Sequence, residues 1–407
     1  MTQPAFDALL VENVHPDADS ALTQYGPVAI RRVAGSPSPE ALRSEIARAQ
    51  VLGIRSRTQV DAALLDAAPE LLAVGCFCIG TNQVDLSAAA SRGIPVFNAP
   101  FANTRSVAEL TMASVIMLMR RVPEKMSAIE RGEWLKSADG CNEVRKKKLG
   151  IIGYGNIGAQ LSVIASALGM HVYFYDIEPK LAHGNARPME SLDALIAECD
   201  VVTVHVPSTA RTRNLMNAER IKAMKPGSFL INQARGDLVD VDALAEALRS
   251  GHLAGAAVDV FPVEPKSKDE RFESPLIGCP NVILTPHIGG STLEAQAAIG
   301  MDAATKLARF LFEGATSQSV NFPEVDPGPL QPGRVRILAP HLNRPGYLRK
   351  LNNMAEDAGA NVAAQFLQTD GELGYAVADL EGELPDDFLD RIRAIDGTIR
   401  ARAIRAR

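Results

Sequence analysis

The feature of the sequence that most constrains its fold is a glycine-rich turn between two short apolar runs. Residues 149–152 predict a buried strand, residues 159–168 have the pattern of a helix, and residues 171–175 predict a second strand that ends at Asp176. The turn is Gly-Tyr-Gly-Asn-Ile-Gly, with its glycines at Gly153, Gly155 and Gly158. Such a glycine pattern alone is a weak signal that also occurs in ordinary α/β domains. Strand, turn, helix, strand and terminal acid in this order indicate a dinucleotide-binding unit.

Each residue of this unit meets a separate physical demand. Gly153 permits the tight turn, Gly155 lets the backbone approach a pyrophosphate, and Gly158 allows the helix to pack closely on the strand. The pyrophosphate would lie at the N-terminus of the helix, where free N–H groups and the helix dipole favour an anion. Asp176 would accept hydrogen bonds from the adenosine ribose and repel a 2′-phosphate, and neither of the next two residues is basic. The pattern therefore predicts NAD rather than NADP as the cofactor.

The composition excludes several classes of protein. A length of 407 residues predicts two or three domains, and 46% hydrophobic with 22% charged residues is typical of a soluble globular protein. The net charge of −6 argues against nucleic-acid binding, and no apolar run is long enough for a membrane span. The N-terminus lacks a signal-peptide pattern, and the five scattered cysteines favour buried thiols in the cytoplasm over a disulfide framework or a metal site.

The order of the predicted elements divides the chain into domains. Residues 8–97 alternate short apolar strands with helices, which predicts a doubly wound parallel sheet without phosphate-binding glycines of its own. More β–α units follow Asp176, and a long helix over 291–313 has the length to cross back to the first sheet. We therefore expect a flavodoxin-like substrate-binding domain of residues 1–103 and 291–325, with a Rossmann-type domain of residues 104–290 inserted in it.

The last part of the chain predicts a third, smaller domain. Residues 321–333 have the composition of a linker, with prolines at Pro323, Pro327, Pro329 and Pro332. Beyond them, residues 334–407 show the order β-α-β-β-α-β of a ferredoxin-like sandwich. A module this small on a catalytic body is expected to regulate or to associate rather than to catalyse.

Three residues that follow later strands could carry out hydride transfer on a 2-hydroxy acid. Arg235, in Asn-Gln-Ala-Arg-Gly-Asp, offers a fork of donors for a carboxylate, and His287, in Thr-Pro-His-Ile-Gly-Gly, offers an imidazole to take the hydroxyl proton. Glu264, in a loop bracketed by prolines, would fix the tautomer of His287 and raise its pKa. Each residue alone could be an ordinary surface or structural side chain. All three, however, are predicted at the carboxyl ends of parallel strands, where ligands bind in open α/β sheets.

These motifs resemble those of the D-isomer-specific 2-hydroxyacid dehydrogenases. The similarity includes the glycine turn, Ala-Arg-Gly-Asp, Phe-Pro-Val-Glu-Pro and Thr-Pro-His-Ile-Gly-Gly. Residues 75–85 and 97–109 match more closely a bacterial subgroup that carries one C-terminal ACT domain, and the resemblance covers nearly the whole chain. It implies oxidation of 3-phosphoglycerate with NAD at the entry to serine biosynthesis. Two alternatives stay open: reduction of 2-oxoglutarate as main or second activity, and a nucleotide-sensing binding protein without turnover.

The resemblance also implies roles for matching positions. Arg235, Glu264 and His287 would be catalytic. The cofactor site would comprise the three glycines of the turn and Asn156, Ile157, Asp176, Gln233, Ala234, Arg235, Asp259, His287 and Gly290. The anionic groups of the substrate would meet Arg55, Ser56, Arg57 and Asn103, with charge added by Arg105 or Lys136. The alternative for Arg55 and Arg57 is a basic surface cluster. Residues 31–39 do not clearly retain a further substrate-facing lysine of the family, so a contact there is in doubt.

Regulation and assembly are implied in the same way. His341, Asn343 and Asn361 match positions that bind L-serine as a feedback inhibitor at contacts between ACT domains, although turn and cap roles are the alternative for them. Trp134, the only tryptophan, would lie at a dimer contact or else be an isolated core aromatic. We expect a cytoplasmic homotetramer with no nucleic-acid or membrane partner.

Overall fold

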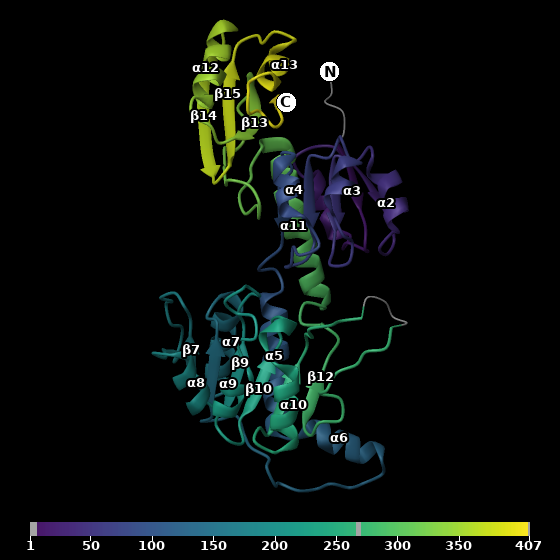
Figure 1. The fold of residues 1–407 in the computed structure, drawn as a ribbon, viewed down its shortest axis with the longest axis vertical. Helices are drawn as coiled ribbons and strands as arrows, with labels where there is room; N and C mark the ends of the chain where they lie inside the picture. The colour runs from purple at the N-terminus through teal and green to yellow at the C-terminus, as the bar shows by residue number, and fades with distance from the viewer. Residues whose placement is uncertain (1–5, 266–269, 406–407) are drawn as a thin grey trace. The chain divides into compact units, whose positions relative to one another are not determined.

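The structure is a computed structural model that describes residues 6–265 and 270–405 (Figure 1). The chain divides into two compact units, residues 1–102 with 296–407 and residues 103–295. None of the helices within the described ranges has the length and hydropathy that a membrane span requires.

The second unit is built on a seven-stranded parallel sheet. Its strands are β6 (Lys148–Ile152), β7 (His171–Tyr175), β8 (Arg187–Pro188), β9 (Val201–Val204), β10 (Phe229–Asn232), β11 (Gly255–Val258) and β12 (Val282–Leu284). Their spatial order is β12-β11-β10-β9-β6-β7-β8. The order reverses between β6 and β9, as it does in a Rossmann fold, and this confirms the predicted nucleotide-binding architecture.

Helices cover both faces of this sheet (Figure 1). On one face α5 (Thr104–Met119) and α7 (Asn156–Ala167) pack against Leu149 and Ile151. On the other face α8 (Leu192–Glu198), α9 (Ala218–Ala223) and α10 (Val241–Arg249) pack in one cluster with Ile152 and the strands beside it. Residues 149–152 of β6 are all buried, because a pleated strand directs successive side chains to opposite faces and helices cover both. The unit also contains α6 (Val122–Glu130) and the short helix η1 (Gly236–Leu238).

The first unit contains a five-stranded parallel sheet. Its strands are β1 (Phe6–Leu10), β2 (Val28–Arg32), β3 (Val51–Ile54), β4 (Ala73–Cys76) and β5 (Val96–Asn98), in the flavodoxin-like order β2-β1-β3-β4-β5. The helices α1 (Asp17–Thr23) and α11 (Leu293–Glu313) pack on one face. The opposite face is covered by α2 (Pro39–Ile46), α3 (Ala62–Asp66) and α4 (Leu86–Ser91).

The C-terminal part of the first unit has the predicted β-α-β-β-α-β order. Its elements are β13 (Arg334–Leu342), α12 (Tyr347–Asp357), β14 (Asn361–Asp370), β15 (Leu373–Glu381), α13 (Phe388–Arg393) and β16 (Arg402–Arg405). They form an antiparallel sheet in the order β14-β15-β13-β16, with both helices packed on one face. A buried pair, Arg336 and Asp379, joins β13 to β15, with Nε 2.6 Å from Oδ1.

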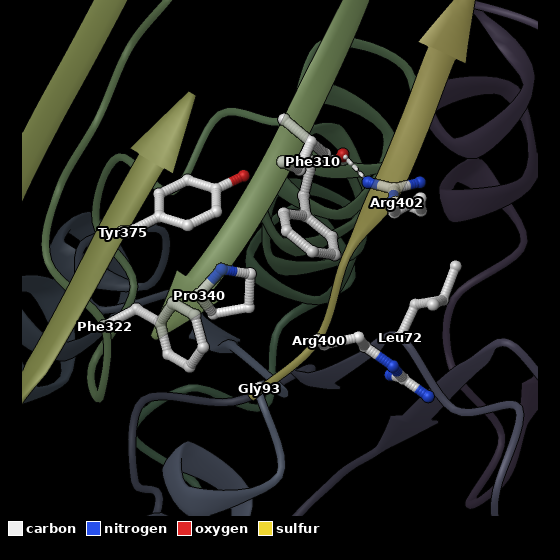
Figure 2. A pocket seen from close by; sticks show the side chains of 9 residues that line it. Leu72, Gly93, Phe310, Phe322, Pro340, Tyr375, Arg400 and Arg402 are labelled. Carbon is white, nitrogen blue, oxygen red and sulfur yellow. Dashed lines mark hydrogen bonds between the residues drawn. The ribbon is translucent and has the colours of Figure 1, made fainter. Parts of the chain in front are cut away.

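Arginine and tyrosine side chains of this sheet bind the carbonyl groups that end α11. The partly buried Arg402 donates to the carbonyl oxygens of Phe310 and Leu311 at 2.8 and 2.9 Å, and desolvation of its guanidinium lowers the pKa of Arg402 to about 10. The Tyr375 hydroxyl donates to the carbonyl oxygen of Gly314 at 2.8 Å. Figure 2 shows a small cavity at this junction, with Arg402 beside Phe310. The last carbonyls of a helix lack partners within the helix, so these side chains serve as its C-terminal cap.

Three features differ from the expectations. The edge strand β2 and the helices α6 and α8 were not predicted, and most predicted element ends lie one to three residues from the observed ones. Residues 321–333 form no helix or strand, which agrees with their linker composition, but they are packed on the C-terminal sheet. Phe322 and Val325 are buried against the sheet face that α12 and α13 leave uncovered. All five cysteines are free thiols, of which Cys76 and Cys199 are fully buried and the other three are only partly so.

Candidate active site

The strand order of the second unit places several chemistry-bearing loops at one edge of the sheet. The glycine turn follows β6, His205 follows β9, Arg235 follows β10, Glu264 follows β11 and His287 follows β12. The strands are parallel, so all these loops leave their carboxyl ends. This is the position where open α/β sheets bind ligands.

The geometry of the turn fits the pyrophosphate of a dinucleotide. Gly153 has φ of +90°, and a Cβ there would lie 2.6 Å from the carbonyl oxygen of His205. A Cβ on Gly158 would lie 2.3 Å from the carbonyl oxygen of Gly153, so only glycine lets α7 approach the turn this closely. A Cβ on Gly155 would meet nothing within 4 Å. No side chain caps the N-terminus of α7 at Asn156, so its first N–H groups face the open space beside Gly155.

Asp176, predicted to bind the ribose of the nucleotide, directly follows β7, the strand beside β6. Its Oδ2 accepts a hydrogen bond from the backbone N–H of Tyr154 at 2.7 Å, and its Oδ1 accepts from the N–H of Glu178 at 3.0 Å. The carboxylate is therefore held against the glycine turn. Each oxygen keeps a second lone pair for a ribose hydroxyl.

His287 and Glu264 form a hydrogen-bonded pair. Nδ1 of His287 lies 3.0 and 3.1 Å from the two carboxylate oxygens of Glu264. This hydrogen bond raises the pKa of His287, and burial opposes it. Burial acts to raise the pKa of Glu264, but the hydrogen bond from His287 and the charge of the imidazolium bring it below its usual value. When His287 is neutral, a proton on Nδ1 leaves the lone pair of Nε2 available to act as a base.

The loop that carries His287 is held by one buried carboxylate. Asp259 is 1% exposed, and it accepts hydrogen bonds from the Thr285 hydroxyl at 2.6 Å and from the backbone N–H groups of Ile288 and Gly289 at 2.8 Å. His287 itself has φ of +56°, a left-handed conformation that is rare for a residue with a side chain. Asp259, predicted to line the cofactor site, thus anchors the loop of the candidate base.

Arg235 lies close to this pair. Its positive charge contributes to the lowered pKa of Glu264 and partly offsets the rise in the pKa of His287. Nη1 of Arg235 donates to the carbonyl oxygen of Ala234 at 2.7 Å. A Cβ on the next residue, Gly236, would lie 2.1 Å from the backbone of Phe261, so glycine is required for the loops after β10 and β11 to meet. The three predicted catalytic residues of the second unit are therefore brought together.

The other predicted cofactor and substrate residues of this unit differ in how their side chains are held. The side chain of Gln233 is buried and bonded to Thr111 and Ser114 of α5, so only its backbone can face a nucleotide. Asn103 is 7% exposed, and its Oδ1 has no partner within the described residues. A Cβ on Gly290 would lie 2.8 Å from Nδ2 of Asn103, so these two predicted site residues are neighbours.

The predicted anion-binding residues of the first unit lie in the loop after β3. Arg55 is partly exposed, while Ser56 and Arg57 are exposed. Neither guanidinium has a hydrogen-bond partner among residues 6–265 and 270–405, so both remain available to a ligand. In the other unit, Arg105 forms an exposed ion pair with Glu109, and Lys136 is exposed beside Trp134.

The chain has relatives among known proteins. A family model described as the NAD-binding domain of the D-isomer specific 2-hydroxyacid dehydrogenases matches residues 112–289. The chain is 54% identical over 396 residues to the D-3-phosphoglycerate dehydrogenase of Haemophilus influenzae, which covers 97% of this chain and 96% of that protein. It is 52% identical over 398 residues to the Escherichia coli protein of the same name, with 97% of each chain covered. The chain belongs to the D-3-phosphoglycerate dehydrogenase family.

A solved structure supports the cofactor. The D-lactate dehydrogenase of Aquifex aeolicus, in complex with NAD and lactic acid, is 27% identical with a TM-score of 0.67 and covers 78% of this chain and 100% of that one. The predicted family, its NAD-dependent oxidoreductase class and NAD as cofactor are thereby confirmed.

One partly buried residue at this edge was not predicted. His205 follows β9, and its Nε2 lies 3.0 Å from the Thr203 hydroxyl, while its Nδ1 has no partner in the described part of the chain. Burial lowers its pKa to about 4, so the ring is neutral. Its place at the end of the strand beside the glycine turn is the signal that could have marked it in the sequence.

The three predicted effector residues do not form one site within a chain. His341 is 2% exposed and lies beneath the ring of Tyr347, with ring centroids 3.7 Å apart and planes 2° from parallel. The backbone N–H of Asn343 donates to Glu372, at the start of β15, whereas Asn361 pairs with Glu381 at its end. Glu372 and Glu381 lie nine residue steps apart along this strand, about 31 Å at ~3.4 Å per residue.

Proposed function

We propose that this chain oxidises 3-phosphoglycerate to 3-phosphohydroxypyruvate with NAD, the first step of L-serine biosynthesis. The observation that carries the proposal is the His287–Glu264 pair beside Arg235 in a chain that matches D-3-phosphoglycerate dehydrogenases over nearly their whole length. When bound, NAD accepts the hydride from C2 of the substrate.

In the proposed reaction His287 acts as the general base. Its Nε2 takes the proton of the C2 hydroxyl, and the imidazolium that forms is stabilised by Glu264 at 3.0 Å. Arg235 holds the substrate carboxylate and polarises the C2 oxygen, because a guanidinium offers two parallel donors to such a group. In the reverse direction the same imidazolium returns the proton.

The remaining residues have binding roles in this proposal. Asn156, Ile157 and the glycine turn receive the pyrophosphate, and Asp176 receives the ribose. Ala234, Asp259 and Gly290 line the nicotinamide end. Arg55, Ser56, Arg57 and Asn103 take the anionic groups of the substrate. The guanidinium groups of the partly exposed Arg55 and the exposed Arg57, which have no hydrogen-bond partner among the described residues, support this placement.

The catalytic assignment is tested with His287→Ala. The variant should lose turnover while its affinity for NADH, measured by fluorescence titration, stays nearly intact. A variant that turns over at a comparable rate would overturn the assignment. If 2-oxoglutarate reduction is faster than oxidation of 3-phosphoglycerate in the unmodified chain, the alternative substrate is the main one. A chain that binds NADH but turns over neither substrate would be a nucleotide sensor.

We further propose that residues 334–405 form an ACT domain at which L-serine inhibits the enzyme. The separation of Asn343 and Asn361 within one chain supports a site formed by two copies, each of which gives one asparagine. The buried His341 would support this site from beneath Tyr347 rather than touch the ligand first. The proposed assembly is a cytoplasmic homotetramer, in which the 83% exposed Trp134 is a contact between copies. Free cysteines are compatible with that reducing compartment.

Complementation between variants tests the effector site. Asn343→Ala and Asn361→Ala should each relieve inhibition by serine. Hybrids assembled from both variants should regain part of it, because one of their two shared sites has both asparagines. Unchanged inhibition in the single variants would refute the site. Hybrids that stay uninhibited would refute its sharing between copies.

A further inference from the structure

Glu12 is a buried carboxylate at the end of a strand in the first unit. It follows β1, is 7% exposed and has φ of +60°, and Asn13 after it has φ of +54°. Two successive left-handed residues that are not glycine are unusual and need surrounding structure to hold them. The contacts of the Glu12 side chain are therefore expected to hold this backbone conformation.

Both oxygens of Glu12 bind backbone amides of the loop after β3. The N–H of Arg57 donates to Oε2 at 3.1 Å, and the N–H of Thr58 donates to Oε1 at 2.7 Å. No ion pair of Glu12 with a lysine, arginine or histidine occurs in the part of the chain that the structure describes. The carboxylate is thus compensated by two successive amides rather than by a cation.

A second side chain holds the other end of the same loop. Nε2 of Gln83 donates to the carbonyl oxygen of Arg55 at 2.6 Å and to that of Gly80 at 3.2 Å. The hydroxyl of Thr58, which is 3% exposed, lies 3.1 Å from that of Ser36. The backbone of residues 55–58 is therefore fixed at both ends, while the guanidinium groups of Arg55 and Arg57 have no hydrogen-bond partner within the described ranges.

We propose that Glu12 is a positioning residue for the anion-binding loop, an inference that rests on the proposed function of Arg55 and Arg57. Successive backbone N–H groups form a concave site for an anion. Glu12 fills this site from within, so the amides of Arg57 and Thr58 bind a fixed internal carboxylate. The substrate then meets the two guanidinium groups, presented from a backbone that binding does not have to order.

Whether removal of the Glu12 charge weakens or strengthens phosphate binding distinguishes a positioning role from a purely electrostatic one. The carboxylate is a negative charge near the residues that receive an anion. If only its charge mattered, its removal would strengthen binding of the phosphate group. If it positions the loop, its removal leaves one amide facing the NH2 group of a glutamine, and binding weakens. The two explanations predict opposite changes.

The experiment compares Glu12→Gln with Asp85→Asn. The side chain of Asp85 also accepts a backbone N–H, that of Ala88 at 2.9 Å, but it caps α4 instead of binding the amides of residues 57 and 58. For each variant we would measure kcat, KM for 3-phosphoglycerate, and Ki for inorganic phosphate as a competing anion. The affinity for NADH and the unfolding temperature serve as controls. In Glu12→Gln, KM and Ki should rise about tenfold or more, with kcat at saturation within about threefold and NADH affinity unchanged. Asp85→Asn should leave KM and Ki as they are.

Each other outcome is decisive. An unchanged or lower Ki in Glu12→Gln overturns the proposal. If that variant does not fold, Gln83→Met, which removes the donor to Arg55 at similar volume, is judged by the same criteria. Arg57→Gln distinguishes an error in the proposed anion site from an error in the proposed role of Glu12. If it leaves Ki unchanged, the proposed placement of the substrate is wrong. If it raises Ki while Glu12→Gln does not, only the positioning role is wrong.

Discussion

Glu264→Gln tests whether the carboxylate charge beside His287 contributes to catalysis. The carboxylate lies 3.0 Å from Nδ1 of His287 and also accepts the N–H of Phe261 at 3.1 Å. Glutamine keeps the shape and one acceptor but loses the charge that stabilises the imidazolium. General acid–base catalysis contributes roughly 10²- to 10⁴-fold. Since the side chain of His287 is 52% exposed to solvent, which screens the pair, we expect the lower part of this range. The expected fall in kcat is about 10²- to 10³-fold, or about 2.7–4 kcal/mol in barrier.

The pH profile gives the same variant an independent readout. Oxidation of the hydroxyl needs neutral His287, so activity falls as pH drops through its pKa. Glu264 raises that pKa through its hydrogen bond, so its replacement should lower the pKa and move the acid limb of kcat to lower pH. Rates of NADH formation over a range of about pH 5 to 9 measure both effects. A kcat within about threefold of the unmodified enzyme, or an acid limb that stays or moves to higher pH, would refute the reasoning.

Four further substitutions test the cofactor site and the C-terminal sheet. Gly155→Ala should weaken NADH binding without changing the unfolding temperature, because its Cβ would enter open space, whereas Gly158→Ala should lower the unfolding temperature because its Cβ would lie 2.3 Å from a backbone oxygen. Equal effects of both on stability would contradict this. Asp176→Asn should weaken NADH binding about tenfold in a fluorescence titration and reduce the preference for NADH over NADPH. If the ratio of the two affinities is unchanged, Asp176 does not contact the ribose. Asp379→Asn leaves the buried Arg336 without its counter-charge and should destabilise the protein by about 3–5 kcal/mol in urea unfolding; a loss below about 1 kcal/mol would contradict a buried pair.

The sequence could predict the nucleotide site because its information is local. The glycine turn, its flanking strands and Asp176 lie within one short βαβ unit, and the structure bears out a steric reason for Gly153 and for Gly158. Arg235, Glu264 and His287 are far apart in sequence. They were predictable as a group because the carboxyl ends of parallel strands meet at one edge.

What the sequence could not predict depends on non-local contacts. The contact of Glu12 with Thr58 spans 46 residues and gives no periodic signal. The separation of Asn343 from Asn361 follows from the register of β15, which pairing alone determines. The edge strand β2 has a partly exposed, arginine-rich sequence that lacks the apolar run of a buried strand. Residues 321–333 look like a linker, because proline content does not reveal that Phe322 and Val325 have a sheet face to cover.

The most direct test of the proposed function is the initial rate of NAD reduction with 3-phosphoglycerate, compared with unphosphorylated D-2-hydroxy acids of similar size, for the unmodified chain and for Arg57→Gln. We predict that 3-phosphoglycerate has the highest kcat/KM and that Arg57→Gln removes most of this advantage, while rates with the unphosphorylated acids change little. Equal kcat/KM for phosphorylated and unphosphorylated acids in the unmodified chain would contradict the account.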